Sequence, residues 1–229
     1  MNEYFIMEKL SLKIQSTFFV THDVKCFRLK RPEGFSFEPG QAAEVSINKE
    51  GWKDEKRPFT FTSLPGEDML EFTIKTYPSR EGVTNQLRDT KENDELILHD
   101  VFGAIQYKGP GVFIAGGAGV TPFISIFRKL RKDGKVEGNK LIFGNKKKED
   151  IILENEFNDL LGDNFINILS DEKTEGHDHG LIDRKYLEKH MGNRDQYFYV
   201  CGPPPMMEMV LDALEELEIP EESIVKEDL

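Results

Sequence analysis

The chain has 229 residues and a formal net charge of −12, with 30 basic against 42 acidic side chains. At roughly 100–200 residues per domain, this length predicts one large domain or two small ones. The excess of acidic residues argues against non-specific binding to nucleic acid or to an anionic membrane surface.

The chain has only two cysteines, Cys26 and Cys201. Two thiols are too few for an all-cysteine zinc site, a four-cysteine iron–sulfur cluster or a disulfide scaffold, and they favour a reducing cytoplasm. The five histidines show no ligand spacing, so we expect no metal site. No apolar stretch approaches about 18 residues and no secretory signal is visible, so we expect no membrane insertion.

The first half, from Leu10 to Gln106, alternates apolar and polar residues with a period of two. The alternation is clearest in three triplets: Leu10, Leu12 and Ile14; Ala43, Val45 and Ile47; and Leu70, Phe72 and Ile74. Turn residues separate these runs, which predicts short antiparallel strands in a barrel or sandwich. One short helix is expected around Thr84–Arg88.

A polar strand is expected at Lys56–Leu64, KRPFTFTSL. Its arginine offers a rigid fork that suits phosphate, its aromatic ring can stack on a planar ligand, and its threonine hydroxyls can bond a heteroatom. An exposed strand of ordinary β-formers explains this stretch equally well by itself. Further on, Gly82-Val83-Thr84 opens the short helix and gives a second possible anion site.

A domain boundary is predicted at Gly109–Gly111, because the apolar period changes after it. Strands are expected at 112–115, 141–143, 165–169, 197–201 and 223–225. Helices are expected at 121–132, 150–161, 183–190 and 205–218. Strands that alternate with helices predict βαβ units and a parallel sheet. The segment Gly176–Gly180, GHDHG, is expected to be a polar loop.

The first parallel strand runs into a glycine-rich turn, VFIAGGAGVTP at 112–122. We expect Thr121 to cap the following helix and Pro122 to open it. Glycines let a ligand approach the backbone, and the helix start favours an anion such as a pyrophosphate. No lysine follows as a P-loop requires, and proline replaces the third glycine of GxGxxG. A tight turn that binds no ligand is the alternative interpretation.

A second such turn, YFYVCGPPPMM, lies at 197–207 and places Cys201 at the end of a strand. In open α/β sheets ligands gather at the carboxyl ends of strands, so both turns can serve one crevice. Cys201 can equally be a small buried hydrophobe. Three lysines, Lys146–Lys148, follow the 141–143 strand, where they can meet a 2′-phosphate or form a solvated charge run.

The order RPFT, GVT, GGAGVTP, CGPPPM resembles the ferredoxin–NADP reductase superfamily of flavoproteins, most of all its cytochrome b5 reductase-like and flavin reductase-like branches. The resemblance covers nearly the whole chain. It implies an antiparallel, Greek-key β-barrel that binds flavin at 1–108, followed by an α/β parallel-sheet domain that binds NAD(P) at 109–229. No iron–sulfur domain is expected.

The resemblance also implies roles for single residues. Arg57 would contact the flavin phosphate, Phe59 would pack on the isoalloxazine, and Thr60 would hydrogen-bond near its N5. The other residues expected on the flavin side are Pro58, Ile74, Lys75, Tyr77, Gly82, Val83 and Thr84. Those expected on the nucleotide side are Gly117, Gly119, Thr121, Pro122, Asn145, Gly202, Pro203 and Met206. Thr60 and Cys201 are the expected catalytic residues.

The implied activity is that of an NAD(P)H-dependent flavoprotein reductase in the cytoplasm. Hydride would pass from NADH or NADPH to bound FAD, with FMN as an alternative, and electrons would leave to a carrier protein, free flavin or a small molecule. The lack of an arginine beside Lys146–Lys148 and the resemblance to NADH-using reductases slightly favour NADH. The alternative function is that of a non-catalytic electron-transfer or regulatory subunit of a larger complex.

Overall fold

The computed structural model describes residues 9–77, 81–103 and 105–227. The chain divides into two units, Met1–Gly103 and Ala104–Leu229. None of the helices in the described part is long and apolar enough to cross a membrane.

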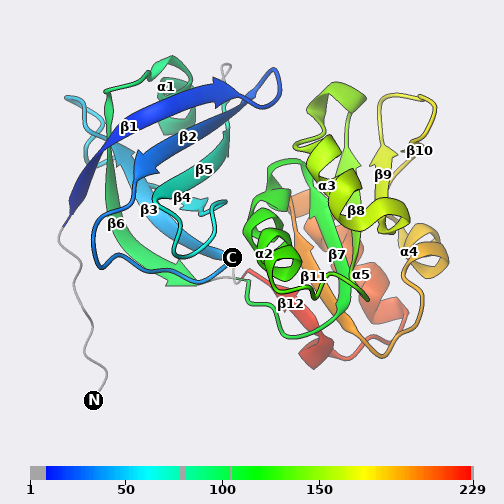
Figure 1. The fold of residues 1–229 in the computed structure, drawn as a ribbon. Helices are drawn as coiled ribbons and strands as arrows, with labels where there is room; N and C mark the ends of the chain where they lie inside the picture. The colour runs from blue at the N-terminus through cyan, green and yellow to red at the C-terminus, as the bar shows by residue number, and fades with distance from the viewer. Residues whose placement is uncertain (1–8, 78–80, 104, 228–229) are drawn as a thin grey trace. The chain divides into compact units, whose positions relative to one another are not determined.

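The first unit is an antiparallel barrel (Figure 1). Its strands are β1 (Leu10–Phe19), β2 (Val24–Lys30), β3 (Gln41–Ile47), β4 (Arg57–Thr60), β5 (Met69–Lys75) and β6 (Glu95–Gly103). They form one sheet in the order β4-β3-β6-β1-β2-β5. A bridge between Phe61 and Phe72 joins the two edges, and Thr62 N donates to Glu71 O at 2.8 Å. The predicted antiparallel barrel is confirmed.

Aromatic side chains fill the barrel, as the alternating pattern predicts. The ring of Phe61 lies 4.8 Å from that of Phe72 and 4.3 Å from that of Phe37, and all three side chains are buried. The short helix α1 (Val83–Asp89) adds Val83 and Leu87 to the same core.

A buried lysine anchors α1 to the barrel. Lys25 on β2 is 5% exposed, and its Nζ donates to Arg88 O at 2.8 Å and to Thr90 O at 2.6 Å. The same ammonium lies 5.4 Å from the ring centroids of Phe19 and Phe27. Its positive charge therefore sits against the carbonyls that end α1, where a helix is partly negative.

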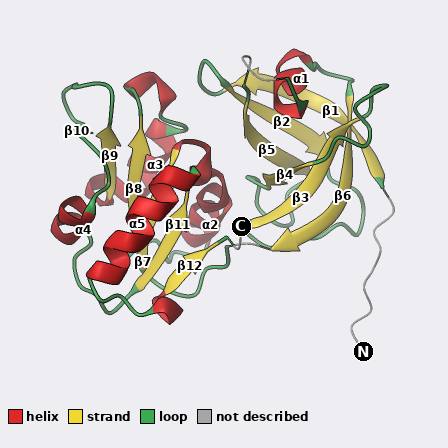
Figure 2. Ribbon diagram, turned by 180° about the vertical axis from the view of Figure 1, so that it is seen from behind, coloured by secondary structure: helices red, strands yellow, loops and turns green. Residues whose placement is uncertain are grey.

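The second unit is a parallel sheet with helices on both faces (Figures 1 and 2). Its strands are β7 (Gly111–Gly116), β8 (Lys140–Asn145), β9 (Phe165–Leu169), β10 (Asp178–His179), β11 (Tyr197–Cys201) and β12 (Ile224–Lys226), in the order β10-β9-β8-β7-β11-β12. Its helices are α2 (Thr121–Lys132), α3 (Glu154–Leu161), α4 (Arg184–His190) and α5 (Pro204–Glu216). The predicted parallel-sheet domain is confirmed.

Each central strand of this sheet is buried on both faces. On β7, Phe113 packs against Phe123 and Phe127 of α2, with ring centroids 5.0 and 4.5 Å apart. Its neighbours Val112 and Ile114 belong to the core that includes α4 and α5. This explains the continuous apolar runs in the sequence. The segment Gly176–Gly180 is not wholly a loop, because β10 pairs there with β9.

A buried tyrosine fixes the chain where the second unit begins. Tyr199 on β11 donates its hydroxyl hydrogen to Gly109 O at 2.7 Å and accepts from Lys108 N and Gly109 N at 2.9 and 3.0 Å. Burial raises the pKa of Tyr199 to about 12. The glycine–proline segment before β7 is therefore held by its hydrogen bonds to β11.

The barrel should depend on the buried lysine. Replacing Lys25 with Met removes two charge-assisted hydrogen bonds and leaves Arg88 O and Thr90 O without them, at a cost of about 1.5–3 kcal/mol. We expect urea unfolding to show this loss in Lys25→Met. The control is Lys13→Met on the exposed side of β1. Equal unfolding midpoints for the two variants would show that Lys25 does not anchor α1.

Candidate functional site

The arginine expected to bind the flavin phosphate begins β4 on the barrel surface. Arg57 is exposed, its Nη1 donates to the neighbouring Lys56 O at 2.6 Å, and its Nη2 lies 3.8 Å from Glu55. An exposed ion pair of this length contributes little. The guanidinium can therefore turn to an anionic ligand at small cost. Pro58 beside it is also exposed.

The next two residues of β4 differ in environment. Phe59 is half-buried and packs against the barrel core. Thr60 is 8% exposed, and among the described residues its hydroxyl has no hydrogen bond. A hydroxyl without a protein partner in the described structure suits a ligand that brings a donor or acceptor.

A buried polar network joins the segment directly after β4 to β5 and β2. Glu71 is 7% exposed and accepts from Thr62 Oγ1 at 3.0 Å and from Arg28 Nε at 2.9 Å. Ser63 Oγ accepts from Glu71 N at 3.0 Å, and the hydroxyls of Thr62 and Thr73 lie 3.2 Å apart. Sequence reasoning missed Glu71, because a glutamate in an alternating strand usually faces solvent.

The end of β5 and the start of α1 carry the other predicted flavin residues. Ile74 and Val83 point into the core, so only their backbone is free for a ligand. Lys75 is paired with Asp23 at 2.9 Å, and Tyr77 is half-buried. Of the other two residues expected there, Gly82 precedes the first turn of α1 and Thr84 lies within it.

In the second unit, the two glycine turns pack backbone against backbone. A Cβ on Gly119 would overlap the carbonyl of Cys201 and lie 2.6 Å from Gly202 N. A Cβ on Gly116 would overlap Met206 Sδ and lie 2.9 Å from Pro203 Cδ. The close approach admits only glycine. The turn after β7 and the turn after β11 therefore form one structure at the carboxyl edge of the sheet.

The helix after the first turn begins differently from the prediction. A 3-10 turn, η1 (Gly117–Val120), precedes α2, so Thr121 is the first residue of α2 and Pro122 lies in its first turn. Thr121 does not cap the helix, because its hydroxyl donates to Ala118 O at 3.0 Å. Gly117 has a φ of +51°, and a Cβ there would meet nothing within 4 Å. The turn is therefore open on that side.

Asn145 ends β8 with a buried amide that lacks partners. The side chain is 8% exposed, and its Nδ2 and Oδ1 make no hydrogen bond in the described structure. Leaving such groups unpaired costs free energy, so the site suits a ligand or water. Asn167 Oδ1 on neighbouring β9 is also unpaired. The three residues after Asn145, Lys146–Lys148, have exposed side chains.

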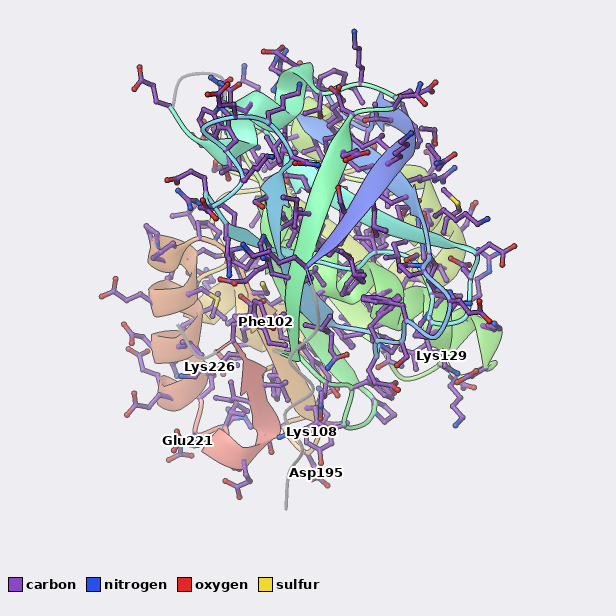
Figure 3. The ribbon with its side chains drawn as sticks, turned by 90° about the vertical axis from the view of Figure 1, so that its left-hand side faces the viewer. Phe102, Lys108, Lys129, Asp195, Glu221 and Lys226 are labelled. Atoms are coloured by element: carbon purple, nitrogen blue, oxygen red, sulfur yellow. The ribbon has the colours of Figure 1, made fainter. Side chains whose placement is uncertain are left out.

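A carboxyl that sequence reasoning missed lies beside Cys201. Figure 3 shows β12 running from near Glu221 to Lys226, and Lys226 pairs with Val200, so Glu227 follows at the level of Cys201. Burial raises the pKa of the Glu227 carboxyl. Burial is the larger cause and the Glu227 charge the smaller cause of a raised pKa at the Cys201 thiol. Cys201 is therefore a neutral thiol rather than a thiolate nucleophile.

The glycine contact can be tested by adding one methyl group. Gly119→Ala places a Cβ on the Cys201 backbone, which cannot move away as a flexible side chain can. We expect destabilisation at or above the roughly 1–3 kcal/mol typical of overpacking. Chemical unfolding of the variant measures it, with Gly117→Asn as control, because space is open there and asparagine tolerates a positive φ. Equal losses in both variants would contradict the close contact.

The raised pKa of Glu227 predicts a pH-dependent effect on stability. The folded state holds this proton more tightly than the unfolded chain does. Wild-type stability therefore falls as the pH rises above the ordinary glutamate pKa of 4.5 and through the raised pKa. Glu227→Gln should match wild type in acid and become more stable than it toward neutral pH. The control is Glu222→Gln at an exposed position, whose stability relative to wild type should not change across this pH range. The same pH trend in Glu227→Gln and Glu222→Gln would show that burial of Glu227 does not cause it.

Comparison with known proteins finds two family models that together match most of the chain. The model of the FAD-binding domain matches residues 7–121, and that of the oxidoreductase NAD-binding domain matches residues 113–212. The chain is 30% identical over 224 residues to the propane 2-monooxygenase reductase component of Mycolicibacterium goodii, a match that covers 89% of this chain and 63% of that protein.

Two further proteins are similar. The naphthalene 1,2-dioxygenase system ferredoxin–NAD(P)(+) reductase component of Pseudomonas putida is 26% identical over 213 residues, covering 89% of this chain and 64% of that one. This chain thus spans less than two thirds of the length of either relative. The flavohem-like FAD/NAD-binding domain of nitric oxide dioxygenase from Vibrio cholerae O1 biovar El Tor has the same fold, with a TM-score of 0.85, 20% identity, and 96% and 98% of the two chains covered.

The barrel matches a FAD-binding domain, and the parallel sheet with its interlocked glycine turns matches an NAD-binding domain. The chain therefore belongs to the ferredoxin–NADP reductase superfamily of FAD- and NAD(P)-binding flavoprotein oxidoreductases.

Proposed function

We propose that this chain takes electrons from NADH or NADPH onto bound FAD and passes them to a separate carrier protein. The observation that carries this proposal is the interlocking of the two turns after β7 and β11 at the carboxyl edge of the parallel sheet. Ligands of open α/β sheets bind at that edge.

The residues of the barrel fit FAD. Arg57 is exposed, with a bond to the neighbouring Lys56 O and a weak ion pair to Glu55, so it can turn to a phosphate. Within the described residues the Thr60 hydroxyl has no protein partner. Phe59, half-buried between them, can pack on the ring system. These residues lie on β4, which pairs with β3, and the network around Glu71 fixes Thr62 directly after this strand.

The residues of the second unit fit a nicotinamide nucleotide. Gly117 leaves open space at the start of η1, the 3-10 turn that leads into α2. The first N–H groups of a helical turn have no partner within it, which favours a pyrophosphate there. Asn145 offers a buried amide without partners at the end of the next strand. Gly202 and Pro203 form the second turn, in which Cys201 supplies a neutral thiol at the edge of the sheet.

When bound, FAD supplies the redox chemistry: it accepts a hydride equivalent from the nucleotide and releases electrons. The chain supplies binding and orientation. Holding two reactants in near-attack geometry is worth as much as about 7–11 kcal/mol. Thr60 would orient the flavin and Cys201 the nicotinamide, and Glu227 beside Cys201 keeps its proton to a higher pH than an exposed carboxyl does.

The relatives suggest the kind of acceptor. Their names describe reductase components of oxygenase systems, one of them a ferredoxin–NAD(P)(+) reductase component. We therefore propose a small electron carrier or an oxygenase component as the acceptor. NADH is the proposed donor. The segment after β8, Lys146–Lys148, carries no arginine, the side chain best suited to hold the 2′-phosphate that distinguishes NADPH.

The function is tested by anaerobic reduction. The FAD-loaded chain is mixed with NADH and with NADPH in parallel, and flavin absorbance is followed by stopped flow. We expect bleaching that is faster with NADH, and steady turnover with an artificial acceptor. Bleaching without turnover would support a regulatory subunit instead. A chain that neither binds flavin nor oxidises either nucleotide would disprove the proposal.

The role of Arg57 can be separated from that of the fold. Arg57→Ala removes a charge that has no strong protein partner, so stability should change by less than about 1 kcal/mol. Flavin affinity should fall about tenfold or more, since a charge-assisted bond to phosphate is lost. Fluorescence titration with FAD measures it, with Lys56→Ala as the neighbouring control. Unchanged flavin affinity in Arg57→Ala would remove this assignment.

A further inference from the structure

The carboxyl end of α2 gathers positive charge in a chain that is acidic as a whole. Five of the eight residues at 128–135 are basic and one is acidic, whereas the chain carries a net charge of −12. A helix carries only about half a negative charge at its carboxyl end, so this concentration of cations exceeds what the helix dipole balances. Residues 128–135 are here called the basic end of α2.

Two of the five cations are paired within the protein. Arg128 bonds the carboxylate of Glu156 on α3 through Nε at 2.6 Å and Nη2 at 2.8 Å. Lys129 Nζ lies 2.7 Å from the carboxylate of Asp133, one helical turn away. The other three cations are exposed and make no salt bridge within the described part of the chain: Arg131, Lys132 and Lys135. Their charge is available to a partner.

The turn that ends α2 folds Lys135 back onto the helix. Lys135 N donates to Leu130 O at 2.8 Å, and Gly134 N donates to Arg131 O at 3.1 Å. Gly134 has a φ of +67°, so the two bonds are those of a Schellman turn, which fixes the direction of the chain after a helix. Lys135 therefore adds its charge to the same surface as the last turn of α2.

The carboxyl of Asp133 shows that these cations act at one place. Its pKa is lowered, first by the hydrogen bond from Lys129 and then by the charges of Lys129, Lys135 and Lys132. A single carboxylate thus lies within reach of three ammonium groups and can neutralise only one of them. The basic end keeps a net positive charge.

The other face of the same sheet carries the opposite charge. In the second unit, α2 lies on one face of the sheet and α5 on the other, as Figures 1 and 2 show from the two sides. The stretch 204–223, which contains α5, has seven acidic residues, all with exposed side chains, and no lysine or arginine. The second unit is therefore electrically polarised. An acidic macromolecule would be attracted toward the basic end of α2 and repelled from α5.

The basic end lies at the amino edge of the sheet, away from the glycine turns. A Cβ on Gly138 would lie 3.2 Å from Pro110 Cβ, and Gly111 N donates to Asn139 Oδ1 at 3.2 Å. The chain that follows the basic end therefore runs beside the start of β7, whereas the glycine turns follow the ends of β7 and β11. A partner on the basic end would leave those turns open to a nucleotide.

The surroundings favour a protein over a membrane or a nucleic acid as the partner. The large apolar side chains of α2 are all buried, so none can enter a bilayer as a membrane-bound helix requires: Phe123, Ile126, Phe127 and Leu130. The basic end has no aromatic residue that could stack on a base. The net charge of −12 opposes an extended anionic surface, whereas a small acidic patch on a protein needs only a local match.

We propose that the basic end of α2 is a docking surface for an acidic patch on a partner protein, whose carboxylates pair with Arg131, Lys132 and Lys135. Because this surface lies at the opposite edge of the sheet from the glycine turns, the partner and a nucleotide can be bound together. The inference goes beyond the proposed function, since it does not depend on which molecule receives the electrons.

The test uses a fluorescent oligoglutamate peptide as the probe and measures its binding to the FAD-loaded chain by anisotropy. Binding should weaken when NaCl rises from about 0.05 to about 0.5 M, because salt screens exposed charges. The triple variant Arg131→Gln, Lys132→Gln, Lys135→Gln should bind roughly tenfold more weakly, since three exposed ion pairs are lost. NAD⁺ should not displace the peptide.

The matched control removes the same charge from exposed positions elsewhere in the second unit. It is the triple variant Lys173→Gln, Lys185→Gln, Lys189→Gln, which should bind the peptide as wild type does. NADH oxidation with an artificial acceptor should be equal in wild type and both variants. Absence of peptide binding, or equal weakening in the two triple variants, would overturn the inference and leave the proposed function intact.

Two further probes and one measurement separate the other occupants. The probes are vesicles of equal parts phosphatidylserine and phosphatidylcholine, and a short DNA duplex. Stronger binding of either than of the peptide, lost in the triple variant of the basic end, would overturn the inference in favour of a membrane or a nucleic acid. Sedimentation equilibrium should show no self-association. Self-association that the same variant abolishes would identify a second copy of this chain as the occupant and overturn the inference.

Discussion

The contact between the backbones at Gly119 and Cys201 constrains the whole carboxyl edge of the parallel sheet. Because no side-chain atom fits between them, the turn after β7 fixes the turn after β11 and so the start of α5. The side chain of Met206, from the first turn of α5, packs over Gly116 and Gly202, where an added Cβ would overlap or crowd its sulfur. Two segments about eighty residues apart in sequence thus become one surface, which is what a dinucleotide spanning both turns requires.

The two units use buried polar groups differently. In the barrel, Lys25 and Glu71 form hydrogen bonds within the protein: Lys25 joins β2 to the end of α1, and Glu71 joins β5 to β2 and to Thr62. In the second unit, Asn145 keeps two buried polar atoms unpaired. Satisfied networks specify a fold, whereas an unpaired buried amide at a strand end is typical of a site that is completed by a ligand or water.

Much of the fold could be predicted because most strands and helices have a clear hydrophobic period and are bounded by glycine or proline turns in the local sequence. The bounds of α2, β9 and β11 agree with their predicted ranges, since each is a strong apolar pattern between clear turns. The two-residue strand β10 was missed, because its side chains are polar and only its pairing with β9 defines it. Glu227 beside Cys201 was also missed, because its position depends on tertiary contact between segments.

The central claim is that the turns after β7 and β11 form one nucleotide site together with the end of β8. Backbone amide NMR of the FAD-loaded chain, titrated with NAD⁺, tests this most directly. We expect the largest shift changes to fall together on residues 116–121 and 145–148 and on the non-proline residues of the second turn, Cys201, Gly202 and Met206, with one common dissociation constant. Changes confined to one of these segments, or clustered at the amino edge of the sheet around Gly138 and Asn139, would contradict it.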